Sequence, residues 1–151
     1  MVVAIAVGSA AALLAAALVK RARDRREMER HSITAEALHQ LRTSDPDVLV
    51  VDVRLPLDLL AHSVIIPGAK RIAPREVQQN PRLLPNDRDV VVYCTCPSDE
   101  TSRFILHKAR SLGFARIKFL KGGLEAWKAR GFPVEPYDQP FSLDTGDPAR
   151  P

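Results

Sequence analysis

The chain of 151 residues has very little cysteine: Cys94 and Cys96 are the only two, and a single residue separates them. Cysteines this close fit the geometry of a structural disulfide poorly, which argues against a small secreted fold held together by disulfides. Reduced thiols are typical of a reducing compartment. The histidines are also few and have no metal-ligand spacing with the cysteines, so we expect neither a metal nor another cofactor. They are His31, His39, His62 and His107.

Aromatic residues make up only 5% of the sequence, and the body of the chain lacks a stripe of basic residues. The net charge of +4 comes mainly from residues 20–30, where six basic side chains outweigh three acidic ones and contribute +3. The rest of the chain therefore carries only +1. Because a nucleic-acid-binding surface needs clustered basic side chains, we expect no nucleic-acid partner.

Residues 2–19 contain no charged residue and consist largely of Ala, Val, Leu and Ile. A helix of this length just crosses the hydrocarbon core of a bilayer, about 30 Å thick. Basic residues follow this apolar run, and the positive-inside rule then places the main domain in the cytoplasm. We therefore predict that residues 1–31 form a single-pass membrane anchor with a basic juxtamembrane helix. A cleaved signal peptide, with small residues at Ala15–Ala17, and a buried helix remain alternatives.

After residue 31, apolar runs typical of strands alternate with segments of helical spacing. This alternation predicts an α/β fold, a doubly wound parallel sheet flanked by helices, with sites at the carboxyl ends of the strands. The tail from residue 137 is rich in Pro, Asp and Gly and is predicted to be loose, which leaves residues 32–136 as the folded domain. The expected strands are 32–34, 48–53, 70–72, 90–93 and 117–120, and the expected helices follow Thr34, Arg54, Ala73, Glu100 and Gly122.

Both cysteines lie where the predicted strand 90–93 meets the next helical segment. A thiol that faces the first turn of a helix meets unpaired N–H groups and the positive end of the helix dipole. Both favour the thiolate, which is the nucleophilic form of cysteine. Any function that depends on a cysteine must therefore be located in this segment.

Five segments, in this order and spacing, resemble the single-domain rhodanese family over residues 32–136. The resemblance implies a two-step transfer of sulfane sulfur, in which a cysteine thiolate takes sulfur from a donor as a persulfide and passes it to a thiol or another nucleophilic acceptor. It implies no cofactor. The segments are Asp52-Val53-Arg54, Ile66-Pro67-Gly68-Ala69, the cysteine loop, Gly113-Phe114 and residues 120–127.

The resemblance also selects the nucleophile, because the catalytic cysteine of this family begins a short loop that ends in a serine at the start of a helix. Ser102 matches that serine, and counting back six positions gives Cys96. Cys94 is then either a small buried side chain or a resolving thiol. The predicted active-site loop consists of Pro97, Ser98, Asp99, Glu100, Thr101 and Ser102.

The loop departs from the family pattern, which carries arginine or lysine where this chain has Asp99 and Glu100. Two carboxylates near the helix start oppose a bound anion, so thiosulfate is disfavoured as the donor. A neutral or protein-borne donor suits the loop better. By resemblance, we also expect a structural charge network of Asp52, Arg54 and Asp58.

Three other functions compete with a membrane-anchored sulfurtransferase. The fold can serve as a non-catalytic module that binds a protein partner at the membrane. A phosphatase of the same fold would need an arginine at the position of Ser102, and Arg103 is turned away by about 100° on a helix. A thiol–disulfide role would use Cys94 together with Cys96.

Overall fold

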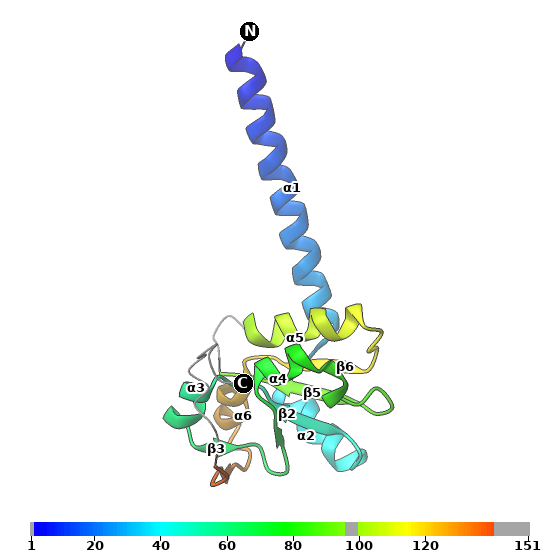
Figure 1. Ribbon diagram of the computed structural model, residues 1–151, viewed down its shortest axis with the longest axis vertical. Helices are drawn as coiled ribbons and strands as arrows, with labels where there is room; N and C mark the ends of the chain where they lie inside the picture. Colours follow the sequence, from blue (N-terminus) through cyan, green and yellow to red (C-terminus); the bar gives the residue numbers. More distant parts are fainter. Residues whose placement is uncertain (1, 96–99, 141–151) are drawn as a thin grey trace, which may run out of the picture. The chain divides into compact units, whose positions relative to one another are not determined.

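The computed structural model describes residues 2–95 and 100–140, without the side chains of 2–11, 100, 102 and 103. The chain divides into two compact units, residues 1–31 and 32–151. Figure 1 shows the elements in sequence order. They are α1 (Val2–Arg30), β1 (Ser32–Ile33), α2 (Ala35–Ser44), β2 (Leu49–Asp52), α3 (Pro56–Ala61), β3 (Val64–Ile65), β4 (Lys70–Arg71), α4 (Pro74–Gln79), the 3₁₀ helix η1 (Pro81–Leu83), β5 (Val90–Tyr93), α5 (Glu100–Ser111), β6 (Ile117–Leu120), α6 (Gly123–Ala129) and β7 (Glu135–Pro136).

The first unit is the single helix α1, which runs without interruption through the basic segment. Among the residues whose side chains the structure describes, no helix combines the length and the apolar character needed to cross a membrane. The side chains of residues 2–11, the first part of the predicted span, lie outside that set. The membrane anchor predicted for residues 2–19 is therefore not supported.

In the described part of the second unit, five strands form a parallel sheet in the order β1-β6-β5-β2-β4. All four strand pairs of this sheet are parallel, which confirms the prediction from the alternating elements. Strands β5 and β2 are central, and Val51 and Val92 are fully buried, as expected for strands covered on both faces. In register, Asp52 lies beside Tyr93 on one side and Arg71 on the other.

Helices cover the sheet in two layers, with α4 and α5 in one layer and α2 and α6 in the other (Figure 1). The core beneath α2 and α6 includes Leu38, Val91 and Trp127. The indole Nε1 of Trp127 donates a hydrogen bond to the carbonyl of Pro133 at 2.7 Å, so even this large side chain is buried with its polar atom satisfied.

A small antiparallel ribbon, β3 with β7, was not predicted from the sequence. Each strand has only two residues, and β7 includes Pro136. Strands this short cannot show the alternation of apolar and polar residues by which a strand is predicted. The ribbon joins the chain after α3 to the C-terminal segment. As a result, the residues just beyond the ribbon, Tyr137 to Pro140, line cavities of the domain.

Replacing Thr34 by alanine is expected to lower the free energy of unfolding by about 1 kcal/mol, because Thr34 caps α2. Its Oγ1 accepts the N–H of Ala37 at 3.2 Å. Thr43→Ala is the matched control: its hydroxyl donates to the His39 carbonyl on the exposed face of the same helix, and we expect a change within about 0.5 kcal/mol. Urea titrations followed by Trp127 fluorescence measure both, and equal losses would contradict the cap assignment.

Candidate active site

The candidate site lies at the carboxyl edge of the parallel sheet, where β5 ends at Tyr93 and α5 begins at Glu100. This is the predicted junction between a buried strand and a helix. The predicted nucleophile, Cys96, lies outside the described residues, as do Pro97, Ser98 and Asp99. Of the remaining loop residues, Glu100 and Ser102 are described by their backbone only, and Thr101 is half-buried in the first turn of α5.

Cys94 is the first residue after β5, and its side chain is 1% exposed. Its carbonyl oxygen accepts the N–H of Leu124 at 3.2 Å. This bond links the start of the cysteine segment, residues 94–102, to the first turn of α6. The burial favours a packing role for the Cys94 side chain.

Gly123 is the residue that allows α6 to come this close to the cysteine segment. It has a φ of +54°, and a Cβ at this position would overlap the carbonyl oxygen of Cys94. Only glycine meets both requirements, a left-handed backbone and the absence of a side chain. The sequence predicts a helix that follows Gly122, but it does not indicate this contact.

Gly123→Ala is expected to destabilise the domain far more than Gly131→Ala. Both positions have positive φ, but a Cβ at Gly131 would meet nothing within 4 Å. In the control, the free energy of unfolding should therefore fall by only about 1–2 kcal/mol, the cost of a left-handed backbone for alanine. At Gly123, overpacking against the Cys94 backbone adds about 1–3 kcal/mol. Urea unfolding of the full chain measures the difference. Equal decreases in the free energy of unfolding would show that the close contact at Gly123 does not contribute to stability.

A buried charge network of Asp52, Arg54 and Tyr93 lies at the carboxyl ends of β2 and β5, and Tyr93 directly precedes Cys94. The carboxylate of Asp52 accepts hydrogen bonds from the guanidinium of Arg54 at 3.0 Å (Nε to Oδ1) and 2.6 Å (Nη2 to Oδ2). Both side chains are fully buried. The hydroxyl of Tyr93 donates to the Oδ2 of Asp52 at 3.1 Å. With its charge paired and its lone pairs occupied, the buried carboxylate is tolerated.

The same network fixes the segment that leads from α3 to β4. Arg54 donates to the main-chain carbonyls of His62 and Val64, both at 2.8 Å. The Tyr93 hydroxyl also accepts the N–H of Ile66 at 3.2 Å. The arrangement is therefore a rigid support for the carboxyl ends of β2 and β5.

Burial is the main reason why the pKa of Tyr93 is raised well above its usual range, and the neighbouring Asp52 carboxylate adds to the effect. The phenol therefore keeps its proton for the bond to Asp52 even in alkaline solution, where an ordinary tyrosine loses it. The sequence alone did not lead us to include Tyr93 in the charge network. The available signal was its hydroxyl at the end of a predicted strand.

Asp58, the third member of the predicted network, lies in the first turn of α3 and is half-buried. The structure brings Asp52 and Arg54 together, but within residues 32–95 no hydrogen bond links the Asp58 carboxylate to either of them. The His62 N–H donates to the main-chain oxygen of Asp58 at 3.1 Å, closing α3.

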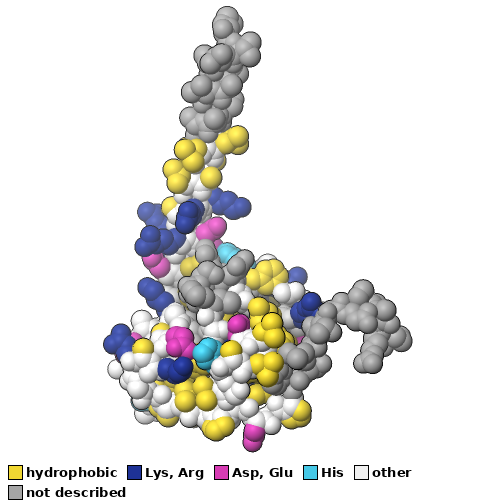
Figure 2. Space-filling model, turned by 90° about the vertical axis from the view of Figure 1, so that its left-hand side faces the viewer, with side chains coloured by type: hydrophobic (Ala, Val, Ile, Leu, Met, Phe, Trp, Pro, Cys, Tyr) yellow, Lys and Arg dark blue, Asp and Glu magenta, His cyan; other side chains and the backbone are white. Residues whose placement is uncertain are grey.

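Apolar side chains are exposed on the surface of the domain (Figure 2). Three of them follow the end of β2: Leu55 is 49% exposed, Leu57 71% and Leu60 50%. They give the rim beside the candidate site an apolar character.

Comparison with known proteins identifies the family. Residues 34–130 match the model of the rhodanese-like domain. A sulfurtransferase of Allochromatium vinosum is 30% identical over 106 residues, which are 69% of this chain and 94% of that protein. A rhodanese-related protein of Thermoplasma volcanium superimposes with a TM-score of 0.59 at 26% identity, covering 70% of this chain and 97% of the other.

A rhodanese-like domain from Anabaena gives a TM-score of 0.58 at 29% identity and covers 80% of this chain and 86% of that domain. Fold, family model and sequence relatives agree over the same region, and they confirm the resemblance noted in the sequence. The chain therefore belongs to the family of rhodanese-like domains.

Proposed function

We propose that this protein is a sulfurtransferase that carries sulfane sulfur as a persulfide on Cys96. The observation that carries the proposal is the position of the cysteine segment, directly between the buried central strand β5 and the first turn of α5, in a chain of the rhodanese-like family. A relative that spans nearly the same domain is named a sulfurtransferase, which supports this reaction over a purely structural role.

In the first step, the Cys96 thiolate attacks the outer sulfur of a donor persulfide R–S–S⁻. A bond forms between the Cys96 sulfur and the transferred sulfur, the donor S–S bond breaks, and the leaving thiolate R–S⁻ takes the electron pair. The N–H groups at the start of α5 favour the thiolate before attack and stabilise the terminal sulfur of the enzyme persulfide afterwards.

In the second step, an acceptor thiolate attacks the terminal sulfur of the Cys96 persulfide. The acceptor leaves as its own persulfide, and the electron pair of the broken S–S bond returns to Cys96 as thiolate. No net oxidation occurs and no cofactor takes part in either step. Asp52, Arg54 and Tyr93 touch no reacting atom in this scheme and serve to hold the strand ends in place.

The donor is proposed to be an organic or protein-borne persulfide in preference to thiosulfate. Asp99 and Glu100 give the loop sequence two negative charges, and these oppose the binding of a dianion at the helix start. The non-catalytic binding module is not favoured, because nearly the full length of the named sulfurtransferase is matched.

Steady-state transfer to cyanide tests the proposal. The full-length chain is supplied with glutathione persulfide, inorganic polysulfide or thiosulfate, and thiocyanate is measured. We expect turnover with the first two donors and a kcat/KM for thiosulfate lower by at least about tenfold. Absence of thiocyanate above the uncatalysed rate with all three donors would contradict the proposed function. Thiosulfate as the best donor would contradict the argument from the acidic loop alone.

A further inference from the structure

A cavity of about 520 Å³ opens at the carboxyl edge of the sheet, beside the candidate active site. Its walls are mainly apolar and come from three parts of the chain: Leu55 and Pro56 after β2, Ala73 and Pro74 after β4, and Tyr137 and Pro140 in the C-terminal segment. This is the size of a pocket for a small organic molecule.

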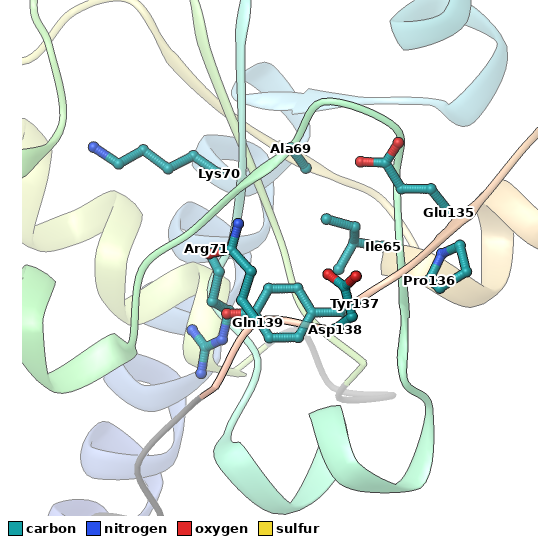
Figure 3. Close-up of a pocket in the computed structure, with 9 residues that line it drawn as sticks. All are labelled: Ile65, Ala69, Lys70, Arg71, Glu135, Pro136, Tyr137, Asp138 and Gln139. Atoms are coloured by element: carbon teal, nitrogen blue, oxygen red, sulfur yellow. The ribbon is translucent and has the colours of Figure 1, made fainter.

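Arg71, the last residue of β4, lines this cavity and also a neighbouring one of about 310 Å³. Figure 3 shows the smaller cavity, in which the Tyr137 ring extends toward the Arg71 side chain. Arg71 therefore lies between two open spaces, with an aromatic ring at its side.

The guanidinium of Arg71 makes few hydrogen bonds within the described part of the chain. Its Nη1 donates to the main-chain oxygen of Asp52 at 3.2 Å. Its Nε is buried and meets no hydrogen-bond partner among the described residues. The Asp52 carboxylate beside it is already occupied by Arg54 and Tyr93. Burial is also the main cause that lowers the pKa of Arg71.

Both signs of charge line the cavity among the described residues: the guanidinium groups of Arg71 and Arg75, and the carboxylate of Glu76. Glu76 uses one oxygen to accept the Ala73 N–H at 2.7 Å, at the start of α4. An anion with an apolar body fits this combination of walls and charge.

The register of the sheet places this cavity close to the cysteine segment. Arg71, Asp52 and Tyr93 form one row across β4, β2 and β5, and Cys94 follows Tyr93 directly. Neighbouring strands are about 4.8 Å apart, so β4 and β5 are separated by about 10 Å. About nine extended bonds span that distance, so a short ligand covers only part of it and the side chains at its two ends cover the rest.

We propose that the cavity binds the carboxylate of a small organic thiol, with Arg71 as its ion-pair partner, and so selects anionic thiols as sulfur acceptors. The proposal rests on the proposed function in so far as the bound thiol is the acceptor. In this arrangement the carboxylate of the ligand is paired with a guanidinium, while its thiol end remains available for the reaction. The thiolate end then attacks the terminal sulfur of the Cys96 persulfide, and the electron pair returns to Cys96.

Binding of a sulfur-free probe tests the cavity independently of any reaction. We expect the full-length protein to bind 3-phenylpropionate at least about tenfold more tightly than the uncharged 3-phenylpropanamide, as measured by ligand-detected NMR titration. Arg71→Gln should remove this difference and Arg71→Lys should retain part of it. Arg82→Gln, an exposed arginine outside the cavity, should leave it unchanged. Equal binding of acid and amide by the unmodified chain overturns the proposal, whatever the variants do.

Acceptor selectivity separates the two proposals. With a persulfide donor, we expect 3-mercaptopropionate to have a higher kcat/KM than 2-mercaptoethanol, and cysteamine to have the lowest. Arg71→Gln should reduce the ratio of kcat/KM between 3-mercaptopropionate and cysteamine by at least about tenfold. Transfer that is equally fast in Arg71→Gln and Arg82→Gln for all three thiols overturns the cavity proposal and leaves the sulfurtransferase standing. Charge-selective binding without transfer to any acceptor would contradict the proposed function instead and leave the cavity as an anion site.

Discussion

Replacing Cys96 by serine is expected to lower sulfur transfer by at least about a thousandfold while the protein remains folded. The reaction needs an atom that forms and releases a sulfur–sulfur bond, and a serine hydroxyl cannot form a persulfide. The expected loss appears in kcat and kcat/KM alike, because the nucleophile takes part in both half-reactions. Thiocyanate formation from glutathione persulfide measures it, with Trp127 fluorescence as the check on folding.

Cys94→Ala is the matched control for this variant. Cys94 is buried at the end of β5, and in a packing role its replacement should leave at least about a third of the transfer rate and cost about 1 kcal/mol of stability. If Cys94→Ala abolished turnover while Cys96→Ser retained it, the two thiols would have been assigned in the wrong order. If both were inactive but folded, Cys94 would be the resolving thiol of a dithiol mechanism.

The second large effect is expected at the buried charge network: Asp52→Asn should lower the free energy of unfolding by about 3–5 kcal/mol. The substitution keeps the size of the side chain but removes the negative charge. In the unmodified chain the Asp52 carboxylate accepts hydrogen bonds from both Nε and Nη2 of Arg54, so the variant leaves a buried guanidinium without its counter-charge. Urea unfolding of the second unit, followed by Trp127, measures the loss.

Two variants calibrate that prediction. Asp87→Asn breaks the exposed pair with Arg88, in which the side chains are 68% and 47% exposed, and should cost at most about 1 kcal/mol. Tyr93→Phe removes only the hydrogen bonds to Asp52 and Ile66. Its decrease in the free energy of unfolding should lie between those of Asp52→Asn and Asp87→Asn. A loss for Asp52→Asn no larger than that for Asp87→Asn would show that the buried pair does not support the strand ends.

The parts of the fold that were predictable are those with a local physical cause. The apolar runs at 48–53 and 90–93 read as buried parallel strands because both faces of such strands are covered, and the structure has β2 and β5 at these positions. Thr34 was predictable as a cap because a threonine before an apolar helical pattern has few other roles. Asp52 and Arg54 were noticeable as charges at the end of an apolar run.

The parts that were not predictable depend on contacts between distant residues. The bond from Ile66 to Tyr93 spans 27 residues, and the overlap that Gly123 avoids involves the carbonyl of Cys94. Nothing in the neighbouring sequence indicates either contact. The ribbon of β3 and β7 was missed for the same reason, and with it the walls of the cavity around Arg71.

The position of the transferred sulfur is the direct test of a persulfide at Cys96. The full-length chain is incubated with glutathione persulfide, and intact and peptide mass spectrometry then maps any added mass. We predict the gain of one sulfur atom on the peptide that contains Cys96, at Cys96 itself, and its loss on addition of cyanide or a thiol. No added sulfur, or sulfur that stays in place when an acceptor is supplied, would contradict a persulfide carrier at this site.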